Sequence, residues 1–461
     1  MSPSDEGFFF VETNMKTTIQ PVIMKFGGTS VSKKENLITI CEIVKREKKR
    51  HPILVVSALS GITDLLVQIT KENNSSEIID KIRSIHTAFI ESIWKDETKR
   101  QELVSFIDTI LEKLRKVLRG ERTIALRDTV LSYGEILSSH IISEAISSFA
   151  APSRAVIATE IIITDTNFGN AEFLSDETIA HAQKVLLPLL KEGVVPVVTG
   201  FIGSTLEGKT TTLGRGGSDY TASILGYCLH AKEVQIWTDV NGIYTADPRI
   251  VKTVYLIPKI SYREASELAS FGAKVLHPRT IKPVIAAGIP LRVLNTFNPK
   301  SMGTLVTDQT QTNSPITAIS HKMKVTLVNI YSLEMLHQKG FLAKVYNIFA
   351  DNNISIDLVS SSEVSESIVL DNDDQLPNAV TEISKFAKVT VKKDVGMVSL
   401  IGDGIVAKTQ TIKEIFEVLH KENILVSMVS LGAIDINVSL VVKSEEVEKA
   451  VRALHINFFK Q

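Results

Sequence analysis

The sequence predicts an α/β protein that is built on a mainly parallel β-sheet. Short apolar segments recur along the N-terminal part of the chain, separated by segments with apolar residues at helical spacing. The predicted strands are Pro21 to Phe26, Ile53 to Val56, Ala155 to Ile163, Val194 to Thr199 and Glu233 to Trp237. Strands that alternate with helices pair in parallel, and ligands bind in the crevice at their carboxyl ends.

The composition bounds the classes of protein to consider. A length of 461 residues suggests two or three domains, and a hydrophobic content of 44% supports sizeable cores. A formal net charge of −1 gives no electrostatic basis for binding nucleic acid or anionic membranes, and no segment approaches the ~20 apolar residues of a membrane span. Cys41 and Cys228 lie in apolar helix-like segments, so we expect buried, reduced thiols in a cytoplasmic protein.

The most distinctive segment runs from Thr199 to Arg249. It contains the turn-rich sequence Leu213-Gly214-Arg215-Gly216-Gly217-Ser218-Asp219, then a helix-like run and a strand. Free N–H groups at a helix start bind anions, and glycines allow a phosphate to approach the backbone closely. Arg215 adds a fork of donors, and Asp219 can cap the helix or hold a lysine. Taken alone, the pattern fits an ordinary tight turn equally well.

A second such element stands near the start of the chain. The strand Pro21 to Phe26 ends in Lys25-Phe26-Gly27-Gly28-Thr29-Ser30, and a helix-like run follows. A lysine at a strand end beside two glycines is a phosphate-binding arrangement. Two elements of this kind in one chain favour a site for a phosphorylated ligand.

Other candidate residues follow the remaining predicted strands and helices. The strand Ile53 to Val56 leads into the small and hydroxyl residues Ser57 to Asp64, which line pockets or cap helices. Glu135 lies among apolar neighbours in a helix-like run, where a surface position is the default for a glutamate. The segment Asn241 to Arg249 is rich in turn residues and fits a loop.

Two further segments are interpreted from local pattern. Ser261 to His277, which includes Lys274, is predicted to be a helix that Pro278 ends. Gly203 to Thr210 matches the P-loop pattern GxxxxGK[ST], but threonines and glycines follow where a P-loop needs a helix. We therefore expect a hairpin there, with Lys209 on the surface.

The C-terminal part of the chain repeats itself at an offset of 70 residues. Val325, Leu327 and Val328 match Val395, Met397 and Val398, and Asn353-Ile354 matches Asn423-Ile424. Each copy has the order strand, helix, strand, strand, helix. Two copies are too few for a solenoid, so the repeat predicts two related small modules.

Three segments resemble the motifs of aspartate kinases (aspartokinases). They are Lys25-Phe26-Gly27-Gly28-Thr29-Ser30, Thr211-Thr212-Leu213-Gly214-Arg215-Gly216-Gly217-Ser218-Asp219 and Phe271-Gly272-Ala273-Lys274-Val275-Leu276-His277-Pro278. Three long motifs in this order are far more specific than one glycine-rich loop. The resemblance extends from about Val22 to the C-terminus and is strongest to the monofunctional, lysine-sensitive type.

The resemblance implies a three-layer αβα amino-acid kinase (carbamate kinase-like) domain, followed by two ferredoxin-like ACT domains of βαββαβ order. The expected divisions are a disordered N-terminal extension (1–20), the kinase domain (21–306), a linker (307–315), the first ACT domain (316–394) and the second (395–461). Residues 316–321 are expected to form a strand of the second ACT domain.

The resemblance also implies ATP-dependent phosphorylation of the L-aspartate β-carboxylate, with Mg²⁺ carried by ATP and no metal site formed by the protein itself. The implied catalytic residues are Lys25, Asp219 and Lys274. The implied substrate contacts are Ser57, Thr63, Glu135, Arg215 and Ser218. The implied ATP contacts are Lys25, Phe26, Gly27, Gly28, Thr238, Asp239, Tyr244, Arg249, Lys274 and Val275.

Regulation is implied as well: this reaction begins the route to lysine (through diaminopimelate), threonine and methionine, and L-lysine would inhibit it. The implied lysine contacts are Met335, Gly340, Phe341, Leu342, Ile356, Asp357, Ser362 and Glu363. Gln338 departs from the family pattern, in which a small hydroxyl residue is frequent. Paired modules of this kind bind effector across a dimer face, so we expect a homodimer or a dimer of dimers, with no nucleic-acid or membrane partner.

Two alternatives stay open at this point. One is a related amino-acid kinase that acts on glutamate, and the other is a degenerate kinase domain that serves as an amino-acid sensor. The tandem modules and the segment from Arg215 to Asp219 favour aspartate. Lys25, Asp239 and Lys274 are all intact, which favours an active enzyme.

Overall fold

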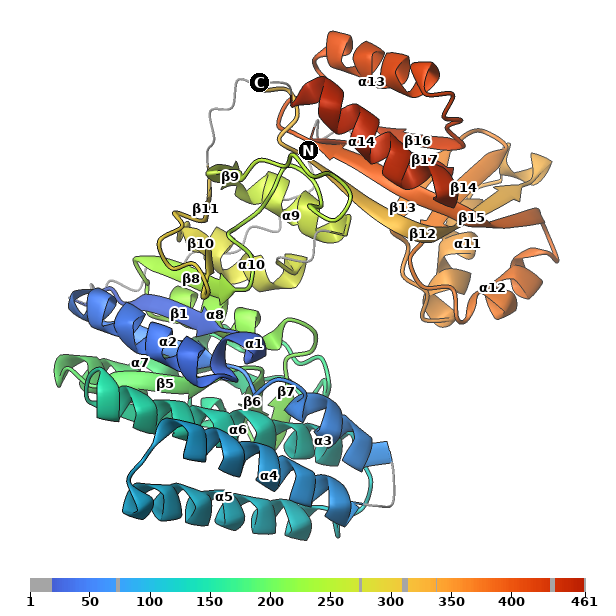
Figure 1. Ribbon diagram of the computed structural model, residues 1–461. Helices are drawn as coiled ribbons and strands as arrows, with labels where there is room; N and C mark the ends of the chain where they lie inside the picture. Colours follow the sequence, from blue (N-terminus) through green and yellow to red (C-terminus); the bar gives the residue numbers. More distant parts are fainter. Residues whose placement is uncertain are drawn as a thin grey trace, which may run out of the picture.

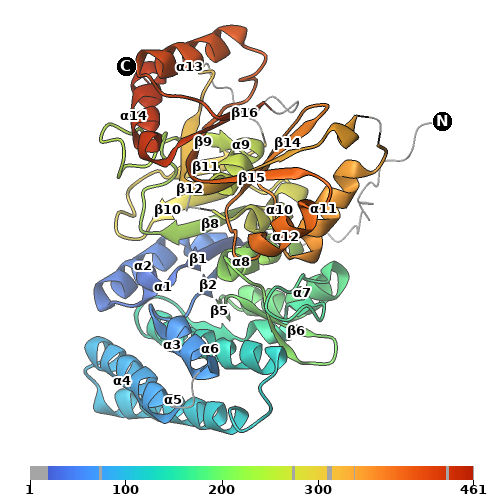
Figure 2. The same cartoon turned by 90° about the vertical axis from the view of Figure 1, so that its right-hand side faces the viewer.

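The computed structural model describes residues 19–71, 75–272, 276–308, 314–336, 338–431 and 436–459. The described residues form an N-terminal unit and a C-terminal unit, which Figures 1 and 2 show at opposite ends of the molecule. The expected N-terminal extension lies outside the described residues except for its last two, and Lys274 and Val275 lie outside them altogether.

The N-terminal unit contains an eight-stranded sheet in the order β3-β5-β2-β1-β8-β10-β11-β9. Neighbouring strands are parallel, except that β10 and β11 are antiparallel. The strands are β1 (Val22–Phe26), β2 (Pro52–Val56), β3 (Ser153–Val156), β5 (Val195–Thr199), β8 (Glu233–Thr238), β9 (Lys259–Ser261), β10 (Leu291–Asn295) and β11 (Thr304–Thr307).

Side-chain alternation along the central strands divides the unit into three layers. In β1, Met24 and Phe26 pack into one apolar core while Ile23 packs into the other. The first core is covered by α2 (Lys34–Glu47), α3 (Ile62–Lys71), α4 (Ser75–Ile93), α5 (Glu97–Val117) and α6 (Ile124–Phe149). The second is covered by α7 (Ser175–Lys191), α8 (Gly217–Cys228), α9 (Tyr262–Ser270) and α10 (Pro278–Ala286). The predicted αβα architecture is therefore confirmed.

Two predicted elements are wrong. Ala155 to Ile163 is not one strand: β3 ends at Val156, and after a 3₁₀ turn the chain joins a separate sheet as β4 (Ile163–Thr164). Ser261 to His277 is not one helix, because α9 ends at Ser270 and Gly272 has a φ of +110°. Pro278 begins α10 instead of ending a helix. An N–H at the first helical position has no partner within the helix, so proline loses no hydrogen bond there.

The C-terminal unit contains one six-stranded antiparallel sheet in the order β13-β14-β12-β15-β17-β16. The strands are β12 (Ala318–Tyr331), β13 (Leu358–Ser361), β14 (Ser365–Leu370), β15 (Lys388–Ile401), β16 (Met428–Leu431) and β17 (Asn437–Lys443). The helices are α11 (Phe341–Asp351), α12 (Leu376–Ile383), α13 (Thr409–Lys421) and α14 (Val447–Phe458).

The predicted repeat is visible in this sheet, because β12 and β15 begin 70 residues apart (388 − 318), as do β13 and β16 (428 − 358). Both long strands cross the two modules. Ala318 to Lys322 pair with the end of β15, and Leu327 to Tyr331 pair with both its beginning and β14. The exact domain limits stay a prediction.

Two smaller expectations concern cysteines and membrane spans. Cys41 and Cys228 are both buried and both free, as predicted. Among the helices in the described ranges, none has the length and apolar character that a membrane span requires.

Candidate active site

The candidate site lies at the carboxyl ends of the parallel strands β1, β2, β5 and β8, which end together in the large sheet. The alternation that sends Ile23 into the second core also points Lys25 toward α8. There its Nζ meets Oδ1 of Asp219, in the first turn of α8, at 2.5 Å. Both side chains keep a small exposed fraction, 13% for Lys25 and 16% for Asp219, so the pair is accessible to a ligand.

Serine hydroxyl groups connect the loops beside this ion pair. The Oγ of Ser57, directly after β2, donates to Oγ of Ser218 at 2.9 Å, and Oγ of Ser138 donates to the Ser57 carbonyl at 2.8 Å. Gly200 follows β5, and a Cβ there would lie 2.5 Å from Oγ of Ser218. Glycine at this position therefore allows the α8 N-terminus to approach the strand edge. Thr63 lies in the first turn of α3.

Glu135 is buried in the middle of α6, with an exposed fraction of 2%. Its Oε1 accepts a hydrogen bond from the N–H of Ala58 at 3.3 Å, but its Oε2 has no partner among the described residues. Burial raises the pKa of Glu135 to about 8. The surface position that a glutamate adopts by default is wrong here, and an unsatisfied buried carboxyl oxygen is a feature that a cationic ligand group would explain.

Arg215 is exposed on the turn that precedes α8. The turn depends on Gly214 (φ +76°) and Gly216 (φ +71°), which adopt left-handed backbone conformations. Burial lowers the pKa of His277, the N-cap of α10, and the positive charge of the nearby Arg215 lowers it further. The charge of Asp219 also acts on His277, so the exposed Arg215 guanidinium group lies near the Asp219 end of the site.

Sequence reasoning missed the residues that hold this turn. Arg279 donates from Nη1 to the carbonyl of Leu213 at 3.0 Å, and its guanidinium lies 4.9 Å from the ring centre of Tyr220. Asp128 is buried in α6 and accepts from the N–H of Thr212 at 2.8 Å. No local pattern indicates these contacts, because each joins residues far apart in the sequence.

The predicted nucleotide contacts lie along β1 and β8, which are neighbours in the sheet. Gly27 and Gly28 lead into the short helix α1 (Gly28–Val31), and a Cβ at Gly28 would lie 2.8 Å from the Ala58 carbonyl. The ring of Phe26 is buried and stacks on Trp237 with centroids 5.8 Å apart. Only its backbone can face a ligand.

The loop after β8 carries the other predicted nucleotide contacts. The Oγ1 of Thr238 donates to Oδ1 of Asp239 at 3.1 Å, and Tyr244 forms an isolated β-bridge with Leu256. Arg249 is exposed, and its guanidinium pairs with Asp247 of the same loop at 2.6 Å. A ligand phosphate would thus compete with Asp247 for Arg249.

A metal site formed by the protein is a separate question. Within the described ranges no group of three or more His, Cys, Asp or Glu side chains is arranged to hold a metal ion. The expectation that Mg²⁺ arrives on ATP stays a prediction.

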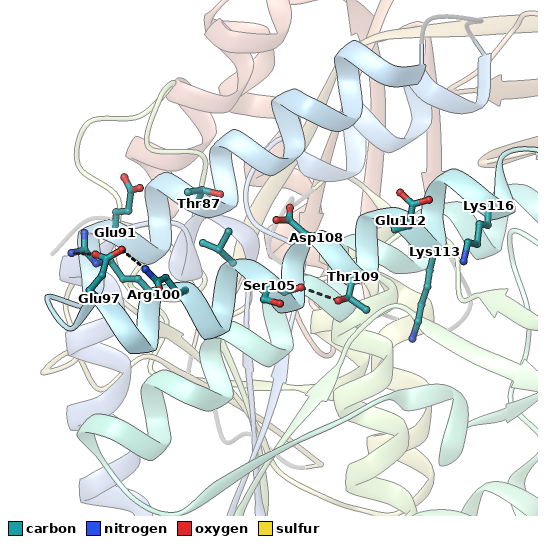
Figure 3. Close-up of a pocket in the computed structure, with 12 residues that line it drawn as sticks. Thr87, Glu91, Glu97, Arg100, Ser105, Asp108, Thr109, Glu112, Lys113 and Lys116 are labelled. Atoms are coloured by element: carbon teal, nitrogen blue, oxygen red, sulfur yellow. Dashed lines mark hydrogen bonds and ion pairs between the residues drawn. The ribbon is translucent and has the colours of Figure 1, made fainter.

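A large surface hollow lies away from all these residues, on the pair of helices α4 and α5 (Figure 3). Three of its charged side chains take part in ion pairs: Arg100 pairs with Glu97 at 2.5 Å, and Asp108 pairs with Arg83 at 2.6 Å. None of the predicted site residues lines it. This hollow is therefore separate from the candidate site.

Comparisons with known proteins decide the family. The amino acid kinase family model matches residues 20–295, and an ACT domain model matches residues 398–458. The lysine-sensitive aspartokinase 3 of Escherichia coli (strain K12) is 37% identical over 95% of this chain and 99% of its own length. The chain belongs to the aspartokinase family. The predicted enzyme class, an aspartate kinase, is confirmed at this level.

Two solved structures of E. coli aspartokinase III, an aspartokinase family member, have the same fold. The R-state complex with aspartate and ADP has a TM-score of 0.84 at 37% identity, and covers 96% of this chain and 100% of that one. The T-state complex with lysine and aspartate has a TM-score of 0.80 at 37% identity, with coverages of 95% and 100%. The residue assignments in the present chain stay predictions.

The residues predicted from the family to bind lysine lie in the first module. Gly340 has a φ of +88° and directly precedes α11, whose first two residues are Phe341 and Leu342. Phe341 is buried in the module core, and Met335, Leu342 and Ile356 pack against that core.

Asp357, immediately before β13, is already paired within the aspartokinase chain. Its Oδ2 lies 3.3 Å from Nζ of Lys322 on β12, which lies equally close to Asp371. Burial raises the pKa of Asp357, and Lys322 opposes this rise. Ser362 hydrogen-bonds within the β13–β14 turn, where Glu363 is exposed.

Lys209 tests the rejected P-loop pattern. It lies in the hairpin between β6 (Ile202–Thr205) and β7 (Thr210–Thr212), has a side-chain exposure of 61% and pairs with Glu207 at 3.0 Å. Exposed ion pairs contribute little to stability. We expect Lys209→Ala to keep turnover within about twofold of the parent in a steady-state assay. A loss as large as that of a catalytic lysine would revive the P-loop interpretation.

Proposed function

We propose that the chain transfers the γ-phosphoryl group of ATP to the β-carboxylate of L-aspartate, forming 4-phospho-L-aspartate. This product opens the route to lysine through diaminopimelate and to threonine and methionine. The observation that carries the proposal is the Lys25–Asp219 pair at the sheet edge, with the unsatisfied Glu135 carboxyl nearby in the same loop network. The related E. coli enzyme in its R-state is in complex with aspartate and ADP.

The reaction needs charge stabilisation more than proton transfer. The acceptor carboxylate is ionised at neutral pH, so no base is required, but two anions must meet. Lys25 would hold the transferring phosphoryl group, assisted by Lys274, and Asp219 would orient the Lys25 ammonium. Mg²⁺ would be held mainly by ATP oxygens and water, as that ion prefers.

The two substrates would lie on either side of Lys25. Arg215 would bind the aspartate α-carboxylate through two parallel hydrogen bonds, and Glu135 would bind its ammonium group. Ser57, Thr63 and Ser218 would line the remainder of this pocket. On the other side, the N–H groups of Gly27 and Gly28 would meet the phosphates, and the residues lining the nucleotide would be Thr238, Asp239, Tyr244, Arg249 and Val275.

A coupled ADP-release assay tests this proposal against its alternatives. Aspartate-dependent ADP release, with glutamate about 10-fold to 200-fold less effective because of its extra methylene, is the expected result. Equal or greater activity with glutamate would favour a related amino-acid kinase. Tight aspartate or lysine binding without any ADP release would favour a sensor.

Arg215→Lys provides a residue-level test of substrate recognition. A lysine replaces the planar two-pronged donor by a single point charge, so it cannot reproduce a bidentate contact with a carboxylate. We expect the KM for aspartate to rise about tenfold or more, the equivalent of one charge-assisted hydrogen bond, with little change in the KM for ATP. A loss confined to the KM for ATP would reassign Arg215 to the phosphates.

Glu135 predicts a pH dependence of aspartate binding. Burial holds its pKa at about 8 without ligand, so the carboxyl is mostly protonated at pH 7. An ammonium partner lowers that pKa, so binding releases a proton and tightens as pH rises toward 8. We expect the KM for aspartate to fall several-fold between pH 6.5 and pH 8, and Glu135→Gln to bind weakly with a flat profile. A flat profile in the parent would contradict the assignment.

We also propose that L-lysine inhibits the enzyme through the first module, in a homodimer or dimer of dimers. The E. coli T-state complex contains lysine, and the present chain has Asp357 in its first module where the second has Ser427, 70 residues later. β13 is an edge strand of the six-stranded sheet, which is a surface suited to pairing with a second copy. Two buried free thiols fit a cytoplasmic setting.

A further inference from the structure

The loop between β8 and β9 is built into the second C-terminal module. Its side chains Ala246, Ile250 and Val251 belong to one apolar core with residues of that module. The partners on the module side include Ile405, Ile415, Val447, Val451 and Leu454. Ile243 and Ile257 pack into the second core of the N-terminal unit, so it is the middle of this loop that takes its apolar support from the C-terminal unit.

The hydrogen bonds of Thr245 fix the middle of this loop. Thr245 has an exposed fraction of 6%, and its carbonyl accepts from the N–H of Ile319, at the start of β12, at 2.8 Å. Its Oγ1 accepts from the N–H of Tyr255 at 3.0 Å and lies 2.9 Å from Nε2 of His455. Since the hydroxyl has one hydrogen and two lone pairs, it can serve both partners.

His455 is itself buried and stacked in the last turn of α14. Its exposed fraction is 2%, and its ring stacks on Phe459 and Tyr255 with centroids 4.6 Å and 6.2 Å away. Burial lowers its pKa, which keeps the imidazole neutral at pH 7 and able to hydrogen-bond the hydroxyl. The position 70 residues earlier is Lys385, which is exposed, so this contact is specific to the second module.

We propose that His455 is a positioning residue for the nucleotide: it holds Thr245, and through it the adjacent Tyr244, in the geometry that ATP or ADP requires. The inference rests on the proposed role of this loop in nucleotide binding. It gives the two modules different tasks, because the first has the carboxylate suited to an effector and the second supports the nucleotide loop.

The test measures ADP binding by calorimetry, with KM values as a second readout. His455→Phe keeps the ring stacking but removes the hydrogen bond, and His455→Gln restores a polar group near Nε2. We expect His455→Phe to weaken ADP binding about threefold to tenfold, the range for one buried hydrogen bond. The KM for ATP should rise equally, while the KM for aspartate and the turnover at saturating ATP stay unchanged, and His455→Gln should recover most of the affinity.

Two controls make the result specific. Ser399→Ala removes a different buried hydrogen bond of the second module, the 2.8 Å contact with Ser439, and should leave ADP binding unchanged. Thr245→Val, which also removes the acceptor of the Tyr255 N–H, should weaken ADP binding at least as much as His455→Phe, and combining the two should add little to the loss in Thr245→Val alone. Parental ADP affinity in His455→Phe, or equal weakening in Ser399→Ala, would overturn the inference. A parent chain that binds no ADP would instead refute the proposed function.

Discussion

Lys25→Ala should lower the turnover number by about 10²–10³ at saturating ATP and aspartate while leaving the fold intact. Lys25 is a preorganised cation at the end of β1, aligned by Asp219, and such groups at a developing charge contribute this much to rate. The side chain is not part of either apolar core, so its removal creates no core cavity. Steady-state kinetics and circular dichroism on the same preparation would check both parts.

The matched control for this variant is Lys209→Ala, which removes an exposed lysine from the β6–β7 hairpin. Near-parental turnover in Lys25→Ala would remove Lys25 from the chemical step. A large rise in the KM for ATP without a fall in turnover would mean that Lys25 stabilises bound ATP and the transition state equally. Lys25 would then bind the nucleotide without accelerating the chemical step.

Asp357→Ala should raise the lysine concentration needed for half-inhibition about 10-fold to 100-fold. Losing a charge-assisted hydrogen bond to an ammonium group costs about 1.5–3 kcal/mol, which corresponds to this range. Inhibition requires lysine to bind the low-activity state more tightly, so a weaker contact reduces the shift in population. Turnover without lysine should stay close to that of the parent.

Asp371→Asn separates effector binding from the internal pair. Asp371 contacts the same Lys322 ammonium as Asp357 but was not predicted as a lysine contact. We expect Asp371→Asn to remain lysine-sensitive. Unchanged sensitivity in Asp357→Ala, or inhibition of the parent by threonine and not by lysine, would refute the effector assignment.

The order of elements was predictable because each central strand is short, apolar and followed by a distinct turn. The 70-residue repeat likewise predicted the paired modules, since β12 and β15 carry the same pattern. The predictions of elements failed where the apolar pattern of the sequence continues past the end of a strand or helix. Ala155 to Ile163 changes sheets without losing its β-branched character, and the α9 helix stops before Gly272 although helical spacing continues.

The site was predictable only where a motif contains the residue. Lys25 and Asp219 belong to motifs, and they form an ion pair because β1 packs beside α8. Glu135 was singled out by resemblance, but its burial follows from the packing of α6 under the sheet, which no local pattern shows. The hydrogen bonds of Arg279 to Leu213 and of His455 to Thr245 join residues more than 60 positions apart, so single-sequence reasoning had no signal for them.

Trapping the product with hydroxylamine tests the central claim most directly. An acyl phosphate reacts with hydroxylamine to give a hydroxamate at the carboxyl group that was phosphorylated, and mass spectrometry against α- and β-hydroxamate standards identifies which one. The account predicts aspartate β-hydroxamate, formed in amounts equal to the ADP released and strongly reduced in Lys25→Ala. ADP release with no hydroxamate, or with the glutamate product as the preferred one, would contradict it.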